Sequence, residues 1–349
     1  MADQPDHLAN RVKLRLLMAG VDPEQVAELD EEAALVLART RLLWGDEPTI
    51  TIQELADRSG LDVEVCRRAR MLLGLPDPGD APVCRVEEVE SFRGFAAGME
   101  QFGEETILQY TRVLGDSLAT VAEGALSVFG RALTERTGDG QLVGDAYVLE
   151  AFDAMEYFRI VPDVLAVIAK LQFEMAIHRL TADPGSPQPG AVGFVDLVDS
   201  TKRTGELGDR RMAEAVTRFE EWSVEQSVVH GGRVIKYIGD EVMFRAPDLA
   251  AAASIATRLI QQVDADPDLG TARAGVAAGD LLGRDGDWYG MTVNLAARLV
   301  ERARDGTVWL AGDGAPEVAG ATPLRGRRRL RGIPERVEVW RIDPGSVAH

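Results

Sequence analysis

Val234-Ile-Lys-Tyr-Ile-Gly-Asp-Glu-Val-Met-Phe244 is the stretch that decides how the second half of this chain folds. Two runs rich in β-branched and aromatic residues flank Gly239-Asp240, which predicts a β-hairpin with an acid in its tight turn. Asp240 is therefore expected to lie exposed at the edge of a sheet.

A second acid lies about forty residues upstream, in the apolar strand Val192-Gly-Phe-Val-Asp-Leu-Val198. A carboxylate in a buried strand is costly unless it is paired or bound to a cation, and Asp196 is the single acid of this one. Asp196 and Asp240 on neighbouring strands would form an oxygen-ligand site for Mg²⁺. This ion takes one or two carboxylates and leaves its other positions to water and substrate phosphates.

The length and charge of the chain divide it into unequal halves. Its 349 residues are enough for two domains of ordinary size. Residues 1–185 carry 17 basic and 33 acidic side chains, and the remainder carries 21 and 24. The acidic half is a poor partner for a nucleic-acid backbone or an anionic membrane surface.

Cysteine usage and hydropathy point to the cytoplasm. Cys66 and Cys84 are the only cysteines, too few for a disulfide framework and without metal-ligand spacing. The chain does not open with a basic-then-apolar leader, and its longest apolar stretch, 160–177, is broken by a proline and three charged residues. We therefore expect a cytoplasmic protein that is neither secreted nor membrane-spanning.

Residues 1–180 are expected to form an all-helical domain, with helices over 8–44, 86–135 and 145–180. Within it, segment 50–75 resembles a helix-turn-helix. A small residue, a turn glycine and two core positions fall at the expected spacing, at Ala56, Gly60, Leu61 and Cys66. DNA could then be read by Arg67, Arg68 and Arg70. The alternative, a helix pair packed inside a helical domain, is favoured by the surrounding acidic charge.

The last helix of this domain, about 157–180, carries a heptad seam. Its positions recur at spacings of 3, 4, 3, 4 and 3: Val161, Val164, Ile168, Leu171, Met175 and His178. Packing inside a bundle and a parallel dimer stem both fit this pattern. His178 is the one polar residue of the seam and a regulatory candidate, since a half-buried histidine changes charge near neutral pH. The alternative is a helix-end residue that reaches solvent.

Residues 181–191 are rich in proline and glycine and predict a linker to a second domain, 192–349. This domain alternates strands and helices. Strands are expected at 192–198, 271–279, 307–310 and 335–342, with a hairpin at 233–246, and helices at 209–229, 248–264 and 292–304. The order suits a ferredoxin-like α+β fold with helices on one face of a mostly antiparallel sheet. Asp199 is expected to cap a helix that opens at Ser200.

Four blocks of the second half resemble, in order and spacing, the signature blocks of the class III nucleotidyl cyclases. They are Phe194-Val-Asp-Leu-Val-Asp-Ser-Thr201, Lys236-Tyr-Ile-Gly-Asp-Glu241, Ala272-Arg-Ala-Gly-Val276 and Asp287-Trp-Tyr-Gly-Met-Thr-Val-Asn-Leu-Ala-Ala-Arg298. The likeness covers about 190–342. The helical half is more loosely similar to the regulatory domain that some bacterial members carry ahead of the catalytic domain.

The resemblance implies a bacterial adenylate cyclase that converts ATP to 3′,5′-cyclic AMP and pyrophosphate. Asp196 and Asp240, with the carbonyl of Leu197, match the ligands of two Mg²⁺ or Mn²⁺ ions per site. Lys236 and Asp287 match the pair that reads the purine. A donor and an acceptor complement adenine, whereas guanine presents the reverse pattern, so ATP is expected over GTP.

The remaining family positions surround the ribose and the phosphates. Asn294 and Arg298 are i and i+4 on one helix and share a face. In the family this asparagine orients the ribose, and the arginine meets the charge that develops on the α-phosphate. Arg273 matches an arginine at the terminal phosphates. Arg331 falls where many members have a phosphate-binding lysine, and a solvated basic face remains the alternative.

Class III sites form between two catalytic domains, so the resemblance also implies a head-to-tail homodimer with two equivalent sites. The helical domain would control their alignment, in response to protons or a small apolar ligand. Two alternatives are a catalytically silent ATP-binding signalling protein and a helix-turn-helix DNA-binding regulator. A guanylate cyclase is a third, opposed by Lys236 and Asp287.

Overall fold

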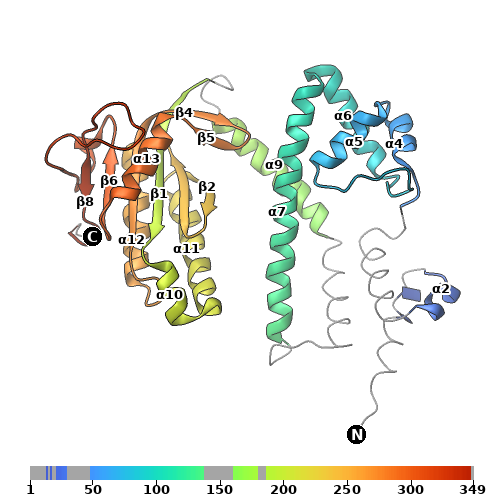
Figure 1. The fold of residues 1–349 in the computed structure, drawn as a ribbon, viewed down its shortest axis with the longest axis horizontal. Coiled ribbons are helices and arrows are strands. Elements are labelled where there is room, and N and C mark those ends of the chain that lie inside the picture. The colour runs from blue at the N-terminus through green and yellow to red at the C-terminus, as the bar shows by residue number, and fades with distance from the viewer. Residues whose placement is uncertain are drawn as a thin grey trace, which may run out of the picture. The chain divides into compact units, whose positions relative to one another are not determined.

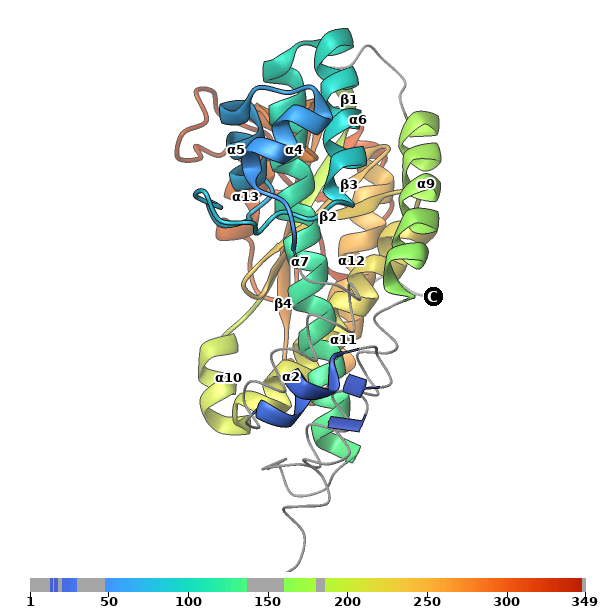
Figure 2. The ribbon, with the colours of Figure 1, turned by 90° about the vertical axis from the view of Figure 1, so that its right-hand side faces the viewer.

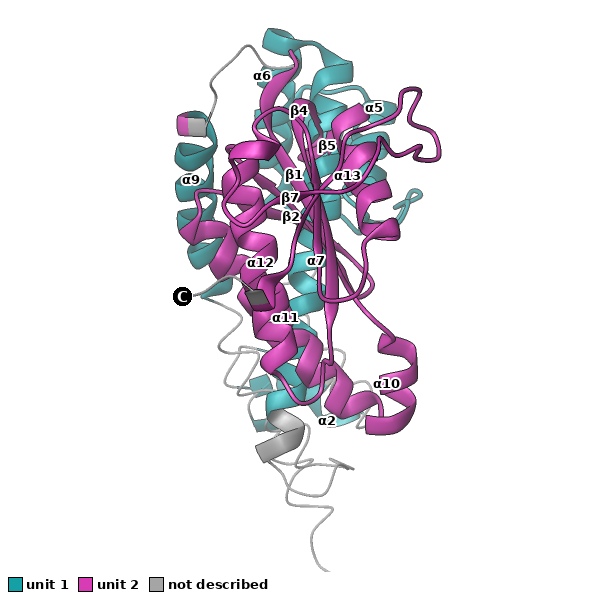
Figure 3. Cartoon of the chain, turned by 90° about the vertical axis from the view of Figure 1, so that its left-hand side faces the viewer, with its two compact units in different colours: residues 1–177 teal, residues 178–349 magenta. Residues whose placement is uncertain are grey.

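A computed structural model describes residues 13–14, 16–17, 21–29, 48–136, 160–179 and 186–346 of the chain (Figure 1). The chain divides into two compact units, residues 1–177 and 178–349 (Figure 3). Each unit has hydrophobic core residues of its own.

In its described residues, unit 1 is helical apart from an isolated bridge between Ile50 and Cys84. Its helices are α2 (Pro23–Glu28), α4 (Ile52–Ser59), α5 (Val63–Leu72), α6 (Glu88–Phe102), α7 (Glu104–Arg136) and α9 (Val161–Arg179). Helices α4, α5 and α6 gather around the first half of α7 (Figure 2). The predicted all-α character is confirmed, while most of the predicted 8–44 segment lies outside the described residues.

Helices α4 and α5 are joined by a short turn, Gly60-Leu-Asp62, where the helix-turn-helix pattern places one. Thr51 and Glu54 form a capping box at the start of α4, with Thr51 N donating to the Glu54 carboxylate at 2.7 Å. Gly60 ends the helix with φ of 80°, a conformation that glycine adopts without steric cost. Ala56 and Cys66 are buried in the core of this unit, as expected.

Two of the three arginines predicted to read DNA are paired within the unit, while Arg68 is exposed. Arg70 is 5% exposed and pairs with Glu88, and Arg67 Nη1 lies 2.6 Å from Asp77 Oδ1. Side chains held in this way are not presented to a DNA groove. The geometry therefore favours the packed-helix interpretation of 50–75 over DNA recognition.

Two long helices of unit 1 expose apolar side chains. Among the described residues, α7 is the one helix long and apolar enough, over Glu104–Ala132, to cross a membrane by length and composition alone. That evidence is weak, and α7 carries an ion pair between Arg112 and Asp116 within this stretch. Helix α9 is exposed along almost its whole length, so the described part of the chain buries no heptad seam.

Unit 2 is an α+β layer structure. Its helices are α10 (Ser200–Leu207), α11 (Asp209–Val229), α12 (Leu249–Ala265) and α13 (Met291–Arg302). Its strands are β1 (Gln188–Leu197), β2 (Arg233–Ile238), β3 (Glu241–Ala246), β4 (Ala272–Arg284), β5 (Asp287–Tyr289), β6 (Val308–Ala311), β7 (Thr322–Pro323) and β8 (Trp340–Ile342). They form one sheet in the order β2-β3-β1-β4-β6-β8-β7, with β5 paired to β4. Every pairing is antiparallel except β4 with β6, which confirms the prediction of a mostly antiparallel sheet.

Helices cover both faces of this sheet, so the prediction of helices on one face is wrong. Helices α11 and α12 pack against one face, together with Val195 and Phe244. Helix α13 lies on the opposite face, with Phe194 and Met243 (Figure 3). The reason is that β1 is apolar on both sides, which is typical of a strand buried between two layers.

Two local expectations also need correction. Strand β1 begins at Gln188, inside the predicted 181–191 linker. Pro189 is tolerated there because it pairs only with β4, while pairing to β3 starts at Ala191. Asp199 does not cap α10: its φ of 57° places it in the left-handed region and its side chain makes no capping bond.

Candidate active site

Three charged residues form a row across the sheet. Asp196 of β1 pairs in register with Glu241 of β3 on one side and with Arg273 of β4 on the other. Strand alternation places Asp196 on the same face as Phe194, which packs in the core layer of α13. The row therefore lies on the α13 side, near the end of the three strands.

Asp196 is held by Arg273. Arg273 donates from Nε at 2.9 Å and from Nη2 at 2.7 Å, both to Asp196 Oδ2. Burial raises the pKa of Asp196 above its ordinary value, and the bonds from Arg273 offset part of that rise. The structure thus brings together two of the predicted site residues in a direct ion pair.

Asp240 lies beside this pair. Gly239, with φ of 66°, makes the tight turn between β2 and β3 that the hairpin pattern predicted. Leu197 N donates to the Asp240 carbonyl oxygen at 3.4 Å, which places the turn next to the end of β1. The negative charge of Asp240 contributes to the raised pKa of Asp196. The two acids predicted as metal ligands therefore share one end of the sheet.

Glu241 is a further acid of this group that sequence reasoning did not single out. Burial, reinforced by the charges of Asp196 and Asp240, raises the pKa of Glu241 to about 7. A signal was present, because Glu241 follows Asp240 directly and begins a strand of otherwise mostly apolar residues. Its side chain brings a third carboxyl group to the cluster.

These residues fit a divalent metal ion. Two carboxylates and a backbone carbonyl are hard oxygen donors of the kind Mg²⁺ binds. No group of three His, Cys, Asp or Glu side chains encloses a metal position anywhere in the described residues. A site with few protein ligands suits an ion that keeps water and substrate phosphates in its remaining positions.

Lys236 and Asp287 are also brought together. Lys236 Nζ lies 2.5 Å from Asp287 Oδ2, and the two side chains are 42% and 22% exposed. Asp287 Oδ1 accepts the Trp288 backbone N–H at 2.8 Å. The Arg245 guanidinium lies 4.5 Å from the centre of the Trp288 ring. Arg245 and Trp288 were not predicted, and they support the strand that carries Asp287.

Asn294 and Arg298 lie on the less buried side of α13, while Ala296 and Leu299 face the core. The Arg298 guanidinium pairs with Glu301 one turn further along the helix. Within the described residues, no hydrogen bond or ion pair joins Asn294 or Arg298 to the aspartates of β1 and the hairpin turn. The charge of Glu301, the partner of Arg298, nevertheless acts on Glu241, so this end of α13 lies near the acids of the hairpin turn.

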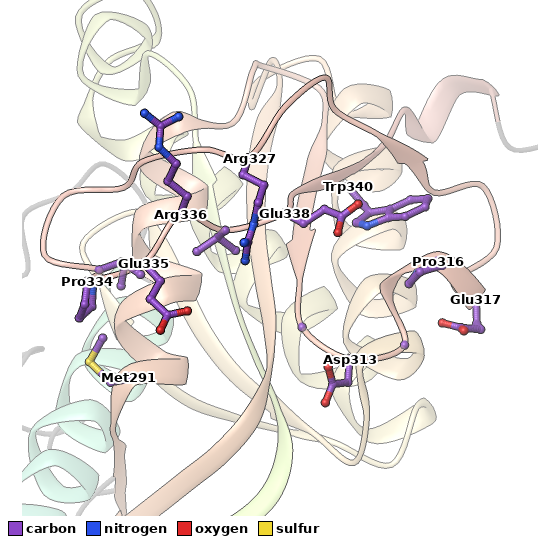
Figure 4. Close-up of a pocket in the computed structure, with 14 residues that line it drawn as sticks. Met291, Asp313, Pro316, Glu317, Arg327, Pro334, Glu335, Arg336, Glu338 and Trp340 are labelled. Atoms are coloured by element: carbon purple, nitrogen blue, oxygen red, sulfur yellow. The ribbon is translucent and has the colours of Figure 1, made fainter.

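The other predicted residues are exposed. Arg331 precedes Gly332, whose φ of 76° makes a turn before β8. His178 lies exposed at the penultimate position of α9, as expected for a helix-end residue that reaches solvent. A nearby pocket of about 720 Å³ contains none of the predicted site residues. It mixes Arg327 and Arg336 with acids such as Glu335 and indicates no ligand class (Figure 4).

Comparison with known proteins matches both halves of the chain. A family model described as the adenylate cyclase regulatory domain matches residues 7–137. An adenylate cyclase of Glutamicibacter nicotianae is 30% identical over 78% of this chain and 72% of its own length. This chain belongs to the bacterial class III adenylate cyclases. The resemblance predicted from the four sequence blocks is thereby confirmed.

Two other relatives span most of the length of this chain. A Streptomyces coelicolor adenylate cyclase is 30% identical over 81% of this chain and 76% of its own length. A protein of Mycobacterium tuberculosis named as a pH-sensitive adenylate cyclase is 30% identical over 97% of this chain and 89% of its own. A solved adenylyl cyclase of P. aeruginosa covers 45% of this chain and 95% of its own at 20% identity, with a TM-score of 0.38.

Proposed function

We propose that this chain converts ATP to 3′,5′-cyclic AMP and pyrophosphate at sites shared between two copies. The observation that carries the proposal is the coincidence, in one unit, of the Lys236–Asp287 pair and the carboxylates Asp196 and Asp240 at one end of the sheet. Divalent metal ions, which class III cyclases generally use, supply when bound the positive charge that activates the ribose 3′-hydroxyl and stabilises the leaving pyrophosphate.

The purine is read by a pair that already satisfies itself. Lys236 donates a hydrogen bond to Asp287, so the two side chains pair with each other. Adenine can replace this contact without loss, because Lys236 can donate to N1 and Asp287 can accept from the 6-amino group. Guanine offers a donor at N1 and an acceptor at O6, which would leave both side chains mismatched. The pair therefore selects ATP over GTP.

Phosphate and ribose contacts fall to exposed, long side chains. Arg273 and Arg331 contact the terminal phosphates, and Asn294 orients the ribose. Arg298 meets the charge that grows on the α-phosphate, a role for which a planar guanidinium with several donors is suited. Its partner Glu301 is exposed and one turn away on the same helix, so releasing Arg298 costs little.

Membership of the class III cyclases, whose sites form between two catalytic domains, supports a head-to-tail homodimer. Asp196 and Asp240 of one copy would face the side chains of α13 from the other. Each of the two sites then uses residues from both copies, and a monomer is inactive. Unit 1 regulates this alignment through α9, in response to protons or a small apolar ligand. The acidic helical half and the pH-sensitive relative support this last step.

The test is cyclic nucleotide formation from ATP and from GTP, with Mg²⁺ and with Mn²⁺. We expect ATP turnover at least tenfold above GTP turnover, and its loss in Asp240→Asn. Reversing both charges of the purine pair, in Lys236→Glu with Asp287→Lys, should lower the ATP preference by about tenfold or more. Lys202→Glu is the matched control, since this α10 lysine is 74% exposed. ATP binding without product would favour the silent signalling protein instead.

A further inference from the structure

The row Glu241–Asp196–Arg273 holds two acids and one basic side chain in register across three strands. With Asp240, three carboxyl groups converge on one end of the sheet. Like charges at one end of the sheet destabilise one another unless a cation lies among them. The only cation in the row is the guanidinium of Arg273.

Arg273 bonds to an oxygen of Asp196, one of the two acids proposed to hold the metal ion. Both of its donors, Nε and Nη2, reach the same oxygen, Asp196 Oδ2, at 2.9 and 2.7 Å. Such charge-assisted bonds are stronger than neutral ones, and an oxygen that accepts two of them has little capacity left for a divalent cation. The metal ion and Arg273 therefore compete for Asp196.

The partly exposed side chain of Arg273 can also move away from Asp196. Its side chain is 33% exposed and that of Asp196 is 20% exposed, so the pair lies at the surface end of the strands. The triphosphate of a nucleotide carries several negative charges and offers the forked oxygen geometry that a guanidinium prefers. A bound triphosphate can thus draw Arg273 away from Asp196.

We propose that Arg273 acts as a stand-in cation on Asp196, so that divalent metal binds this site tightly only when a nucleotide triphosphate has drawn the guanidinium away. This inference rests on the proposed function of the site. By linkage, metal and nucleotide raise each other's affinity through this one side chain. Arg273 is a positioning residue toward the metal as well as a phosphate contact.

The test measures Mn²⁺ binding to the full-length chain without nucleotide, from the electron paramagnetic resonance signal of the free ion. We expect Arg273→Gln and Arg273→Ala to bind Mn²⁺ about five- to tenfold more tightly than wild type, because the competitor is gone. Adding Asp196→Asn to either variant should abolish the gain. Arg258→Gln is the charge-matched control, an exposed arginine of α12 that donates to Gln261 on the same helix.

A second readout uses an ATP analogue with a methylene group between its α- and β-phosphorus atoms. Thermal stabilisation by Mn²⁺ should grow when this analogue is added to wild type, and the growth should shrink in Arg273→Gln. Unchanged or weaker nucleotide-free Mn²⁺ binding in both arginine variants overturns the inference while leaving the proposed function standing. Absence of Mn²⁺ binding to wild type even with the analogue overturns both.

Discussion

Glu241 has a strongly raised pKa, which makes the folding stability of the site depend on pH. It lies opposite Asp196 in the β1–β3 register, and burial together with the two neighbouring aspartates raises its pKa to about 7. In the unfolded chain the same group ionises near 4.5. Because the folded-state pKa is the higher one, Glu241 favours folding most below pH 4.5, and that contribution is lost as the pH rises towards 7.

We therefore expect Glu241→Gln to flatten the pH dependence of folding stability. Without divalent metal, wild type should lose about 1 to 2 kcal/mol of unfolding free energy relative to this variant between pH 4.5 and pH 7.5, discounted for partial exposure. Denaturant titrations across this range, in the presence of a chelator, measure the difference. Glu225→Gln, an exposed position of α11, serves as control. Parallel pH profiles for wild type and Glu241→Gln would contradict the electrostatic origin.

For single residues, the sequence shows which side chains are unusual for their local segment. It does not show which distant residues strand pairing brings beside them. Asp196 stands out because an acid inside an apolar strand needs a partner. Its partner Arg273 lies 77 positions later, and only the pairing of β1 with β4 brings the two together. Glu301, whose negative charge adds to the pKa shift of Glu241, was missed for the same reason.

At the scale of elements, α13 depends on a single glycine. A Cβ at Gly275 of β4 would lie 2.2 Å from Val300 N and 2.5 Å from Ala296 O, both backbone atoms of α13. The helix carrying Asn294 and Arg298 can pack this closely only because position 275 lacks a side chain.

Gly275→Ala should therefore displace α13 and lower both stability and activity. We expect a loss of at least about 3 kcal/mol in unfolding free energy, since backbone cannot move aside as a flexible side chain would. Thermal or denaturant unfolding measures it, alongside cyclic AMP production. Gly205→Ala in α10 is the control, because an added Cβ there meets nothing within 4 Å. Equal stability of the two variants would show that α13 is not seated on this glycine.

Hairpins and helices with local signals were predictable, and the layering was not. Gly239-Asp240 between two β-rich runs predicts β2 and β3 correctly because turn chemistry is local. The second helical layer was missed even though β1 is apolar at successive positions, a pattern typical of burial on both faces. The short strand β7 has only two residues, too few for any periodicity to show.

At the scale of the whole molecule, α9 joins two units whose charges differ. Residues 1–185 carry nearly all of the net negative charge, and α9 exposes apolar side chains along almost its whole length. Exposed apolar side chains in such a number are typical of a surface that is covered in the working assembly. Glu174 and His178 are i and i+4 on this helix and share a face, in the one segment common to both units.

We expect this segment to set the pH response. A chain truncated to begin at Ser186, two residues before β1, should lose the pH dependence that full-length protein shows between about pH 5.5 and 8. His178→Ala in the full chain should reproduce part of that loss, whereas Lys170→Ala on the same helix should not. Cyclic AMP production across the pH range is the measurement. A profile that His178→Ala leaves unaltered removes this residue from regulation.

The last prediction concerns a dimer in which two copies of the chain share each active site. Asp240→Ala removes a carboxylate from one half of the site, and Arg298→Ala removes the guanidinium from the other half, so each variant alone should lose at least about a hundredfold in activity. In a mixed dimer, one of the two sites keeps Asp240 from the second variant and Arg298 from the first. Mixing should therefore restore up to about a quarter of wild-type activity, because half of the dimers are mixed and each has one intact site. Mixing either variant with more of itself is the control. If the mixture stays as inactive as its components while size measurements show dimers, both halves of the site must come from one chain.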